Sequence, residues 1–425
     1  MAQSNNAKLW NLNFFLLWQG RLVSVVGDVV YEIALGFWIL AVTGSTTLMG
    51  TLMAATLLPR VIIAPFAGVW VDRSDRKWLL VWMDLIRGVL VISVGVAAIT
   101  GLIRIWMVFV TGVILGICGA FFGTAVNSAI PDIVPKTHIV KANSVLALAY
   151  TGAGIVGSSA GGFLYQLLGA AWMFLTNGIS YIISGFAEVF VKIPQVEHQE
   201  KEFRFFEDMK SGFSYVWNEK GIKYIMLIGS ALNFFASMGF MLLIPLFQRT
   251  EHLGPGLYGV LMGTFAGGLF LGFLLASTIN IKPSNRFLVF FWCGIAFSAM
   301  FVVIPLYLYF PLMLAFGFIA GITNAILNAL LSSILQLTVP QDKRGRVFGL
   351  MDTTSQGLIP LSLAVGGILA GFIPLRPFIS VCFMITLVSF IPMAFMPDII
   401  RFVNSDVGDE KPAESTIGIS GTLGS

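Results

Sequence analysis

The sequence GVWVDRSDRK, residues 68–77, places five charged side chains within six positions, between two long apolar stretches. Each flanking stretch extends for roughly 20 residues or more, the length that an α-helix needs to cross about 30 Å of hydrocarbon. A short charged segment between two such stretches is typical of a loop that joins two membrane-spanning helices. Residues 68–77 therefore predict a helical hairpin whose connection faces water.

The composition of the whole chain agrees with this interpretation. Of its 425 residues, 57% are hydrophobic and 11% are charged, whereas an ordinary soluble domain has about 25% charged residues. The 45 glycines suit the close packing of helices in a membrane. The three cysteines have no spacing typical of a metal site, and no P-loop or other nucleotide motif is present. We predict an all-α membrane protein that is not an enzyme and that has no metal, cofactor or nucleic-acid partner.

The apolar blocks predict twelve spans. Lysine and arginine gather in the loops on one side, whereas the other side holds only Arg104, Arg249 and Arg376. The positive-inside rule then places both termini in the cytoplasm. The expected spans are residues 12–42, 46–71, 78–100, 104–129, 143–168, 170–191, 221–248, 256–280, 286–305, 308–338, 345–373 and 375–396.

The chain is expected to divide into two bundles of six helices. The pairs Val134-Pro135 and Gly161-Gly162 recur at one common offset as Val339-Pro340 and Gly366-Gly367, which indicates an internal repeat. The predicted organisation is an N-terminal bundle (1–191), a cytoplasmic linker with an amphipathic helix (192–220), a C-terminal bundle (221–396) and a disordered cytoplasmic tail (397–425).

Three ionisable residues lie within the first span. Arg21, Asp28 and Glu32 are seven and four residues apart, so their side chains project from roughly one face of the helix. Charges inside a membrane are costly and are functional candidates by default. A pair of carboxylates one turn apart is a candidate for taking up and releasing a proton near neutral pH. The alternative for this pair is that Arg21 neutralises the two carboxylates in a structural network. Arg60 lies in the second span and needs a counter-ion, for which these carboxylates are the nearest candidates; it serves either a structural ion pair or contact with the substrate.

Other charges lie near the expected cytoplasmic ends of spans. Asp84 and Arg87 are close enough to the loop at 68–77 to join its network, and Asp352 lies in the first turns of the eleventh span. Glu188 lies near the inner end of the sixth span, from which it can extend to the interface. We interpret these four as structural or gating residues. The 37 phenylalanines suit lipid-facing surfaces and also the wall of a cavity for large lipophilic ligands, and composition does not separate the two.

Residues 68–77 carry a specific resemblance. The chain has six expected spans on either side of a central loop, as in the major facilitator superfamily. Residues 68–77 resemble the signature of that family, which reads Gly, three residues, Asp-Arg, two residues and two basic residues. Asp75 stands where the family usually has Gly. That departure, together with SAIPDIVPKTHIVKANS and QLTVPQDKRGRVFG, resembles the branch of bacterial exporters similar to macrolide efflux proteins and the enterobactin exporter. The matching positions are Gly68, Asp72, Arg73, Arg76 and Lys77.

The resemblance implies roles for these residues. In the superfamily this loop latches the cytoplasmic side of the outward-open state, with its Asp meeting the start of span eleven. The resemblance implies that role for Asp72, Arg73 and Arg76, with the region of Asp352 as their expected partner. Exporters of the superfamily also have a glycine motif in span five, which Gly157, Gly161 and Gly162 match, while Ala153 and Ser158 replace a Gly and a Pro.

These observations together predict a secondary active transporter. The expected activity is proton-coupled export of amphipathic or lipophilic organic molecules such as drugs, by alternating access of two bundles. The protein is expected to be a monomer in the bacterial inner (plasma) membrane, with membrane lipids, protons and a small substrate as its partners. The alternatives are a lysophospholipid flippase, a siderophore exporter, and a non-transporting sensor or assembly protein on a transporter scaffold.

Overall fold

The computed structural model describes residues 9–193, 213–279, 281–339 and 341–405. These residues form helices and short connections, with no β-strand among them. Ten of the helices are long and apolar enough to cross a membrane, judged by length and composition. This confirms an all-helical membrane fold, while the total of twelve spans stays a prediction.

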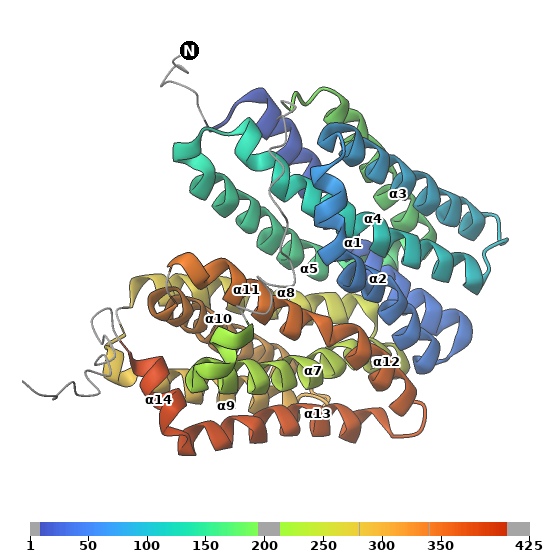
Figure 1. Cartoon of the computed structure of the whole chain (residues 1–425). Coiled ribbons are helices and arrows are strands. Elements are labelled where there is room, and N and C mark those ends of the chain that lie inside the picture. The colour runs from blue at the N-terminus through green and yellow to red at the C-terminus, as the bar shows by residue number, and fades with distance from the viewer. Residues whose placement is uncertain (1–8, 194–212, 280, 340, 406–425) are drawn as a thin grey trace, which may run out of the picture.

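The helices form two groups, one from each half of the chain (Figure 1). The first group contains α1 (Leu12–Thr43), α2 (Thr46–Asp72), α3 (Arg76–Ile99), α4 (Ile105–Ile133) and α5 (Ile139–Val189). The second group contains α7 (Lys220–Arg249), α8 (Pro255–Thr278), α9 (Arg286–Val303), α10 (Phe310–Thr338), α11 (Gln341–Gly357), α12 (Ile359–Leu369), α13 (Leu375–Phe390) and α14 (Pro397–Asn404).

The long helix α5 reverses its direction at Gly169. This residue has φ of 72°, a left-handed conformation that favours glycine. Before the break, Gly157 and Gly161 pack on Val29 and Ile33, so this part runs parallel to α1. After the break, Asn177 packs on Gly27 and Ser184 packs on Gly20, so the second part runs antiparallel to α1. The two parts of α5 thus follow the predicted spans 143–168 and 170–191.

The predicted span 345–373 is also interrupted. It consists of α11 and α12, which are separated at Leu358. Pro360 lies in the first turn of α12, and because proline has no backbone N–H it cannot continue the hydrogen bonds of a preceding helix. Neither helix alone is long enough to count among the ten candidate spans.

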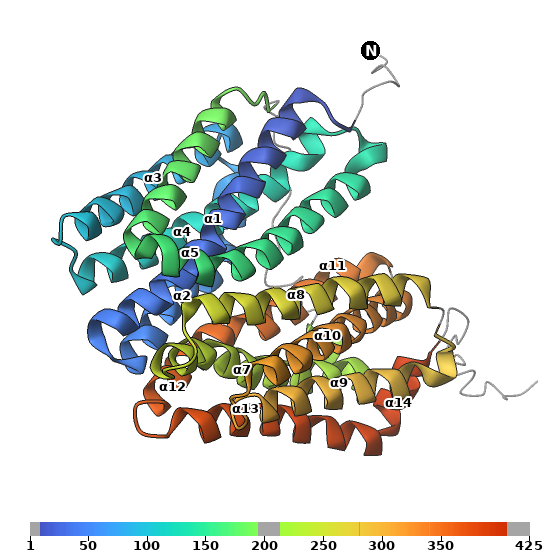
Figure 2. The same cartoon turned by 180° about the vertical axis from the view of Figure 1, so that it is seen from behind.

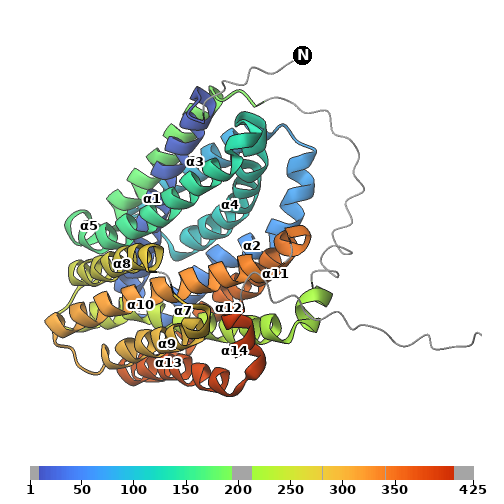
Figure 3. The ribbon, with the colours of Figure 1, turned by 90° about the vertical axis from the view of Figure 1, so that its left-hand side faces the viewer.

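The two groups meet at one end of the molecule through close backbone contacts. A Cβ at Gly162 in α5 would lie 2.7 Å from the amide nitrogen of Gly259 in α8. A Cβ at Gly50 in α2 would lie 2.7 Å from Cα of Gly367 in α12. Figures 2 and 3 show the same arrangement from behind and from the side, with α8 next to α5. Glycine permits these contacts because any side chain would force the backbones apart.

Hydrogen bonds between the groups reinforce this end. The Gln166 side chain accepts a 3.0 Å bond from the Gly256 amide, and Arg249 donates to the Gly44 carbonyl over 2.5 Å. At the opposite end, which carries residues 68–77, a Cβ at Gly68 would meet nothing within 4 Å. The two groups diverge toward that end (Figures 1 and 2). We call the joined end the closed end and the other the open end.

The prediction of a disordered tail from residue 397 is wrong for its first part. Residues Pro397–Asn404 form α14, because Ile399 and Val403, one turn apart, are buried in the apolar core of the second group. The Asn404 side chain accepts a 2.9 Å bond from the Phe287 amide at the start of α9. Residues 406–425 and most of the predicted linker, 194–212, lie outside the described residues.

Candidate functional site

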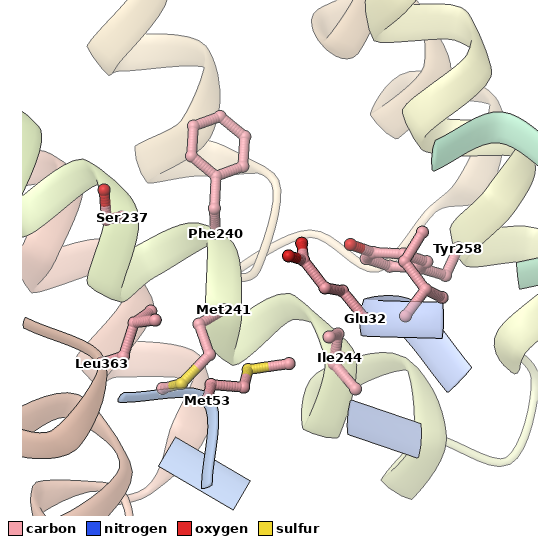
Figure 4. A pocket seen from close by; sticks show the side chains of 9 residues that line it. Glu32, Met53, Ser237, Phe240, Met241, Ile244, Tyr258 and Leu363 are labelled. Carbon is pink, nitrogen blue, oxygen red and sulfur yellow. The ribbon is translucent and has the colours of Figure 1, made fainter. Parts of the chain in front are cut away.

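A cavity of about 290 Å³ lies between the two groups of helices. The cavity is lined by α1 and α2 of the first group and by α7, α8 and α12 of the second group, and α1 contributes Glu32 (Figure 4). Its walls are mainly apolar and include two thioethers, an aliphatic surface and two aromatic rings. The lining residues are Glu32, Ile33, Met53, Ser237, Phe240, Met241, Ile244, Tyr258 and Leu363.

Phe240 belongs to a cluster of aromatic rings that supports one wall. Its ring centroid lies 4.8 Å from that of Phe301 and 5.5 Å from that of Phe383. Phe265 and Phe297 also contact it, at 5.7 Å and 6.3 Å. Such edge-to-face and tilted contacts hold the ring in place, so this wall is preformed.

Tyr258 forms the opposite part of the lining and joins the two groups. Its ring contacts Phe37 of α1 at 5.4 Å and Phe247 of α7 at 5.8 Å. Glu32 is exposed, and the close-up shows its carboxylate projecting between Phe240 and Tyr258 (Figure 4). The charges of Asp28 and Arg60 act on it. An ionisable group therefore faces an otherwise apolar cavity.

The three charges of α1 have different surroundings. Asp28 is half-buried and accepts a hydrogen bond from the Tyr181 hydroxyl of α5. Arg21 is buried, with its Cζ 4.9 Å from the Phe122 ring centroid and 4.6 Å from that of Tyr150. Among the described residues Arg21 forms no ion pair with Asp28 or Glu32, so its partners are mainly aromatic rings. Arg60 is exposed on α2.

Asp84 and Arg87 lie deep in the first group and not with the loop at 68–77, where we expected them. They form an ion pair on α3, and their side chains are 0% and 3% exposed. The Arg87 guanidinium also lies over the rings of Phe122 and Tyr181, at 4.3 Å and 4.4 Å. Two buried arginines, Arg21 and Arg87, thus share the Phe122 ring.

Glu188 joins this buried region, and the expectation that it extends to the interface is wrong. It is 1% exposed, because the second part of α5 packs tightly on α3 at Gly185. The charges of Asp84, Arg87 and Arg21 act on it. We call Arg21, Asp28, Asp84, Arg87 and Glu188 the buried charge cluster.

The loop at 68–77 has a local structure that its sequence explains. Asp75, at the position where the family usually has Gly, caps α3 by accepting hydrogen bonds from the amides of Lys77 and Trp78. Arg76 pairs with Asp132 at the end of α4, and Arg73 is exposed. The side chains of Asp72 and Asp352 lie outside the described part of the structure, so the predicted latch between them stays a prediction.

The glycines of the span-five motif bring α5 against two partners. Gly157 and Gly161 contact α1 at Val29 and Ile33, the residues that directly follow Asp28 and Glu32 in the sequence. Gly162 contacts α8 at the closed end. The motif thus sets the position of α1 relative to the closed end, while its association with export stays a prediction.

Several residues of the site were not predicted. The cavity residues Phe240 and Tyr258 come from spans with many similar apolar residues, and no pattern in one sequence separates them. Tyr181 and Asp132 are partners of Asp28 and Arg76 in space only. For Glu188, the sequence showed only a charged residue near the inner end of a span. We interpreted this residue as one that extends to the interface, and its burial was not predicted.

Comparisons with known proteins identify the family and relatives of this chain. A family model described as the Major Facilitator Superfamily matches residues 17–362. Macrolide efflux protein A of Streptococcus pyogenes is 24% identical over 380 residues, covering 87% of this chain and 91% of the relative. A putative bacilysin exporter of Bacillus amyloliquefaciens is 26% identical over 346 residues, covering 77% and 80%.

Solved structures share the fold. A bacterial homologue of the iron transporter ferroportin, in an inward-facing state, superposes with a TM-score of 0.67 at 15% identity, covering 92% of this chain and 98% of the other. A bacterial homologue of the human lysosomal transporter Spinster, also inward-facing, gives a TM-score of 0.62 at 14% identity, covering 93% and 97%.

Proposed function

The chain belongs to the major facilitator superfamily, and on that premise we propose that it is a proton-coupled exporter of amphipathic or lipophilic organic molecules. The relatives named as a macrolide efflux protein and a putative bacilysin exporter support a small organic cargo. The proposal includes alternating access, in which the closed and open ends exchange roles. The predicted sidedness makes the open end cytoplasmic, so this conformation would be the one that loads cargo from the cell.

One observation carries the proposal: the exposed carboxylate of Glu32 in the cavity between the two groups of helices. Ligand sites are usually concave and mostly apolar, with a few polar groups that fix orientation. The rings of Phe240 and Tyr258 and the thioethers of Met53 and Met241 supply the apolar surface. Glu32 supplies the group that responds to protons, and its cost inside a membrane argues for a use.

The coupling mechanism follows from competition at one site. Cargo and proton both act near Glu32 and Asp28, so binding of one disfavours the other or the conformation that the other requires. The Tyr181 hydroxyl, which donates to Asp28, keeps this carboxylate oriented in the conformation described here. Protonation of Asp28 or Glu32 from the outside weakens the attraction of these carboxylates to Arg60 and Arg21. We propose that this loss of attraction drives the protein back to the conformation described here, in which the cytoplasmic end is open.

The test uses purified protein in liposomes with an imposed pH gradient and radiolabelled erythromycin as the probe. Glu32→Gln and Asp28→Asn are expected to abolish gradient-driven accumulation of the probe while leaving the amount of folded protein unchanged. Glu251→Gln removes an exposed carboxylate outside the cavity and is the matched control. Full gradient-driven accumulation in both Glu32→Gln and Asp28→Asn would refute the coupling assignment.

A further inference from the structure

The carboxyl group of Glu188 is buried without a hydrogen-bond partner. It lies 1% exposed on the second part of α5, away from the cavity between the two groups. Neither carboxyl oxygen has a hydrogen-bond partner among the described residues. The hydroxyl of Ser184 lies nearby, but without hydrogen-bond geometry. An ionised carboxylate at such a place loses its hydration and gains no hydrogen bond in return, which favours the neutral acid.

The arginines that surround Glu188 are already engaged. Arg87 donates to Asp84 in the same helix and to the Met83 carbonyl at 3.3 Å. Its guanidinium also lies against the rings of Phe122 and Tyr181. Arg21 lies against Phe122 and Tyr150. Neither arginine donates a hydrogen bond to Glu188 within the described part of the chain.

The charges of the buried cluster do not balance if every carboxyl group is ionised. The cluster contains two arginines, Arg21 and Arg87, and three carboxyl groups, Asp28, Asp84 and Glu188. Asp84 is paired with Arg87, and Asp28 accepts a hydrogen bond from Tyr181. One added proton makes the cluster neutral. Glu188 is the carboxyl group of the cluster with neither an ion pair nor a hydrogen bond among the described residues, so its ionised form is the least stabilised.

We propose that the buried charge cluster binds one proton, that Glu188 holds this proton in the conformation described here, and that its transfer to or from the cluster contributes to coupling. The coupling part rests on the proposed function, whereas the proton on Glu188 does not. Among the described residues, the charges that act on Glu188 are those of Asp84 and Arg87 on α3 and of Arg21 on α1.

The cluster also connects to the cavity. Arg87 contacts the Tyr181 ring, and the hydroxyl of Tyr181 donates to Asp28. Asp28 in turn is one turn before Glu32, on which its charge acts. Loss of the proton from Glu188 adds a negative charge next to Arg87, and this changes the field at Tyr181 and Asp28. Glu188 therefore acts through these groups as a positioning and proton-holding residue without contact with the cargo.

Infrared spectroscopy of the purified protein tests the proton directly. At neutral pH the wild-type protein is expected to show a C=O stretching band of a neutral carboxylic acid that is absent from Glu188→Gln and retained in the control Glu251→Gln. Because glutamine resembles the neutral acid in shape and charge, Glu188→Gln is expected to fold with at least the thermal stability of the wild type. An unchanged band, or a variant that fails to fold although Glu251→Gln folds, overturns the proposal.

Transport in the same liposomes then tests the coupling. Glu188→Gln is expected to lose gradient-driven accumulation of erythromycin but to keep downhill equilibration, and Glu188→Asp is expected to restore part of the accumulation. If the wild type shows no gradient-driven accumulation, the proposed function fails while the infrared result still decides the proton site. If the wild type accumulates the probe and Glu188→Gln does so equally, the coupling role of Glu188 is overturned and the proposed function stands.

Discussion

The contact between Gly162 and Gly259 offers a direct way to perturb the closed end. In Gly162→Ala the new Cβ would lie 2.7 Å from the amide nitrogen and 3.0 Å from Cα of Gly259. These are backbone atoms of α8, so no flexible side chain can move aside, and α5 and α8 must separate. The substitution is therefore expected to destabilise the closed end relative to a conformation in which these helices lie apart.

The size of the effect follows from the cost of overpacking. Adding one methyl group to a tightly packed contact costs about 1–3 kcal/mol, which changes a conformational equilibrium by roughly 5–150-fold. Alanine also favours the helical backbone over glycine by about 0.5–1 kcal/mol. Gly152→Ala, on the same helix, is the matched control because its Cβ would meet nothing within 4 Å, so it has the backbone effect without the clash.

The assay measures access to the cavity from the closed end. Cys118, Cys293 and Cys382 are replaced, and Ser237, which lines the cavity, becomes the reporter through Ser237→Cys. In vesicles of known orientation, a membrane-impermeant maleimide is added on the side of the closed end. Labelling is expected to be faster in Gly162→Ala than in Gly152→Ala. Equal rates in the two variants, or an equal increase from both sides of the membrane, would refute the reasoning.

Three further predictions concern stability, and thermal unfolding in detergent measures each. Asp84→Asn leaves the guanidinium of Arg87 buried without its charged partner and is expected to cost about 3–5 kcal/mol; an unchanged melting temperature would contradict the buried pairing. Phe240→Ala removes a half-buried ring that contacts Phe301 and Phe383, for an expected loss of about 1–3 kcal/mol, whereas the control Phe270→Ala, whose side chain is 68% exposed, should have little effect. Asn404→Ala removes the acceptor for the Phe287 amide at a cost of about 0.5–2 kcal/mol, and no loss would mean that α14 does not support α9.

The sequence predicted the helices well because a membrane-spanning helix can be recognised from the length and hydropathy of its own segment, without knowledge of its neighbours. The expected spans agree with the observed helices within a few residues, including the reversal at Gly169 inside α5. The errors fall where a local breaker or a short amphipathic segment decides the structure. Pro360 divides the eleventh predicted span, and the apolar pair Ile399 and Val403 orders the start of the predicted tail.

The candidate site was less predictable because it depends on contacts between distant segments. The sequence identified Asp28 and Glu32 by their cost in a membrane, but it did not identify Tyr181 as the hydrogen-bond donor to Asp28. It also grouped Asp84 and Arg87 with the loop at 68–77 by their distance along the chain. In the structure both residues face the interior of the first group, where Glu188 joins them from a helix that is about one hundred residues away.

The divergence of the three charges on α1 has a geometric cause. An α-helix turns by about 100° and rises by about 1.5 Å per residue, so the three side chains project within about 40° of one another, but Asp28 lies about 10 Å and Glu32 about 16 Å beyond Arg21 along the helix axis. Side chains on one face of α1 therefore meet different neighbours because they lie at different positions along the helix. Arg21 consequently lies among aromatic rings, Asp28 meets Tyr181, and Glu32 faces the cavity. One helix thus joins the buried charge cluster to the cavity, and a change of charge at Asp28 alters the field at Glu32 without any contact between the two.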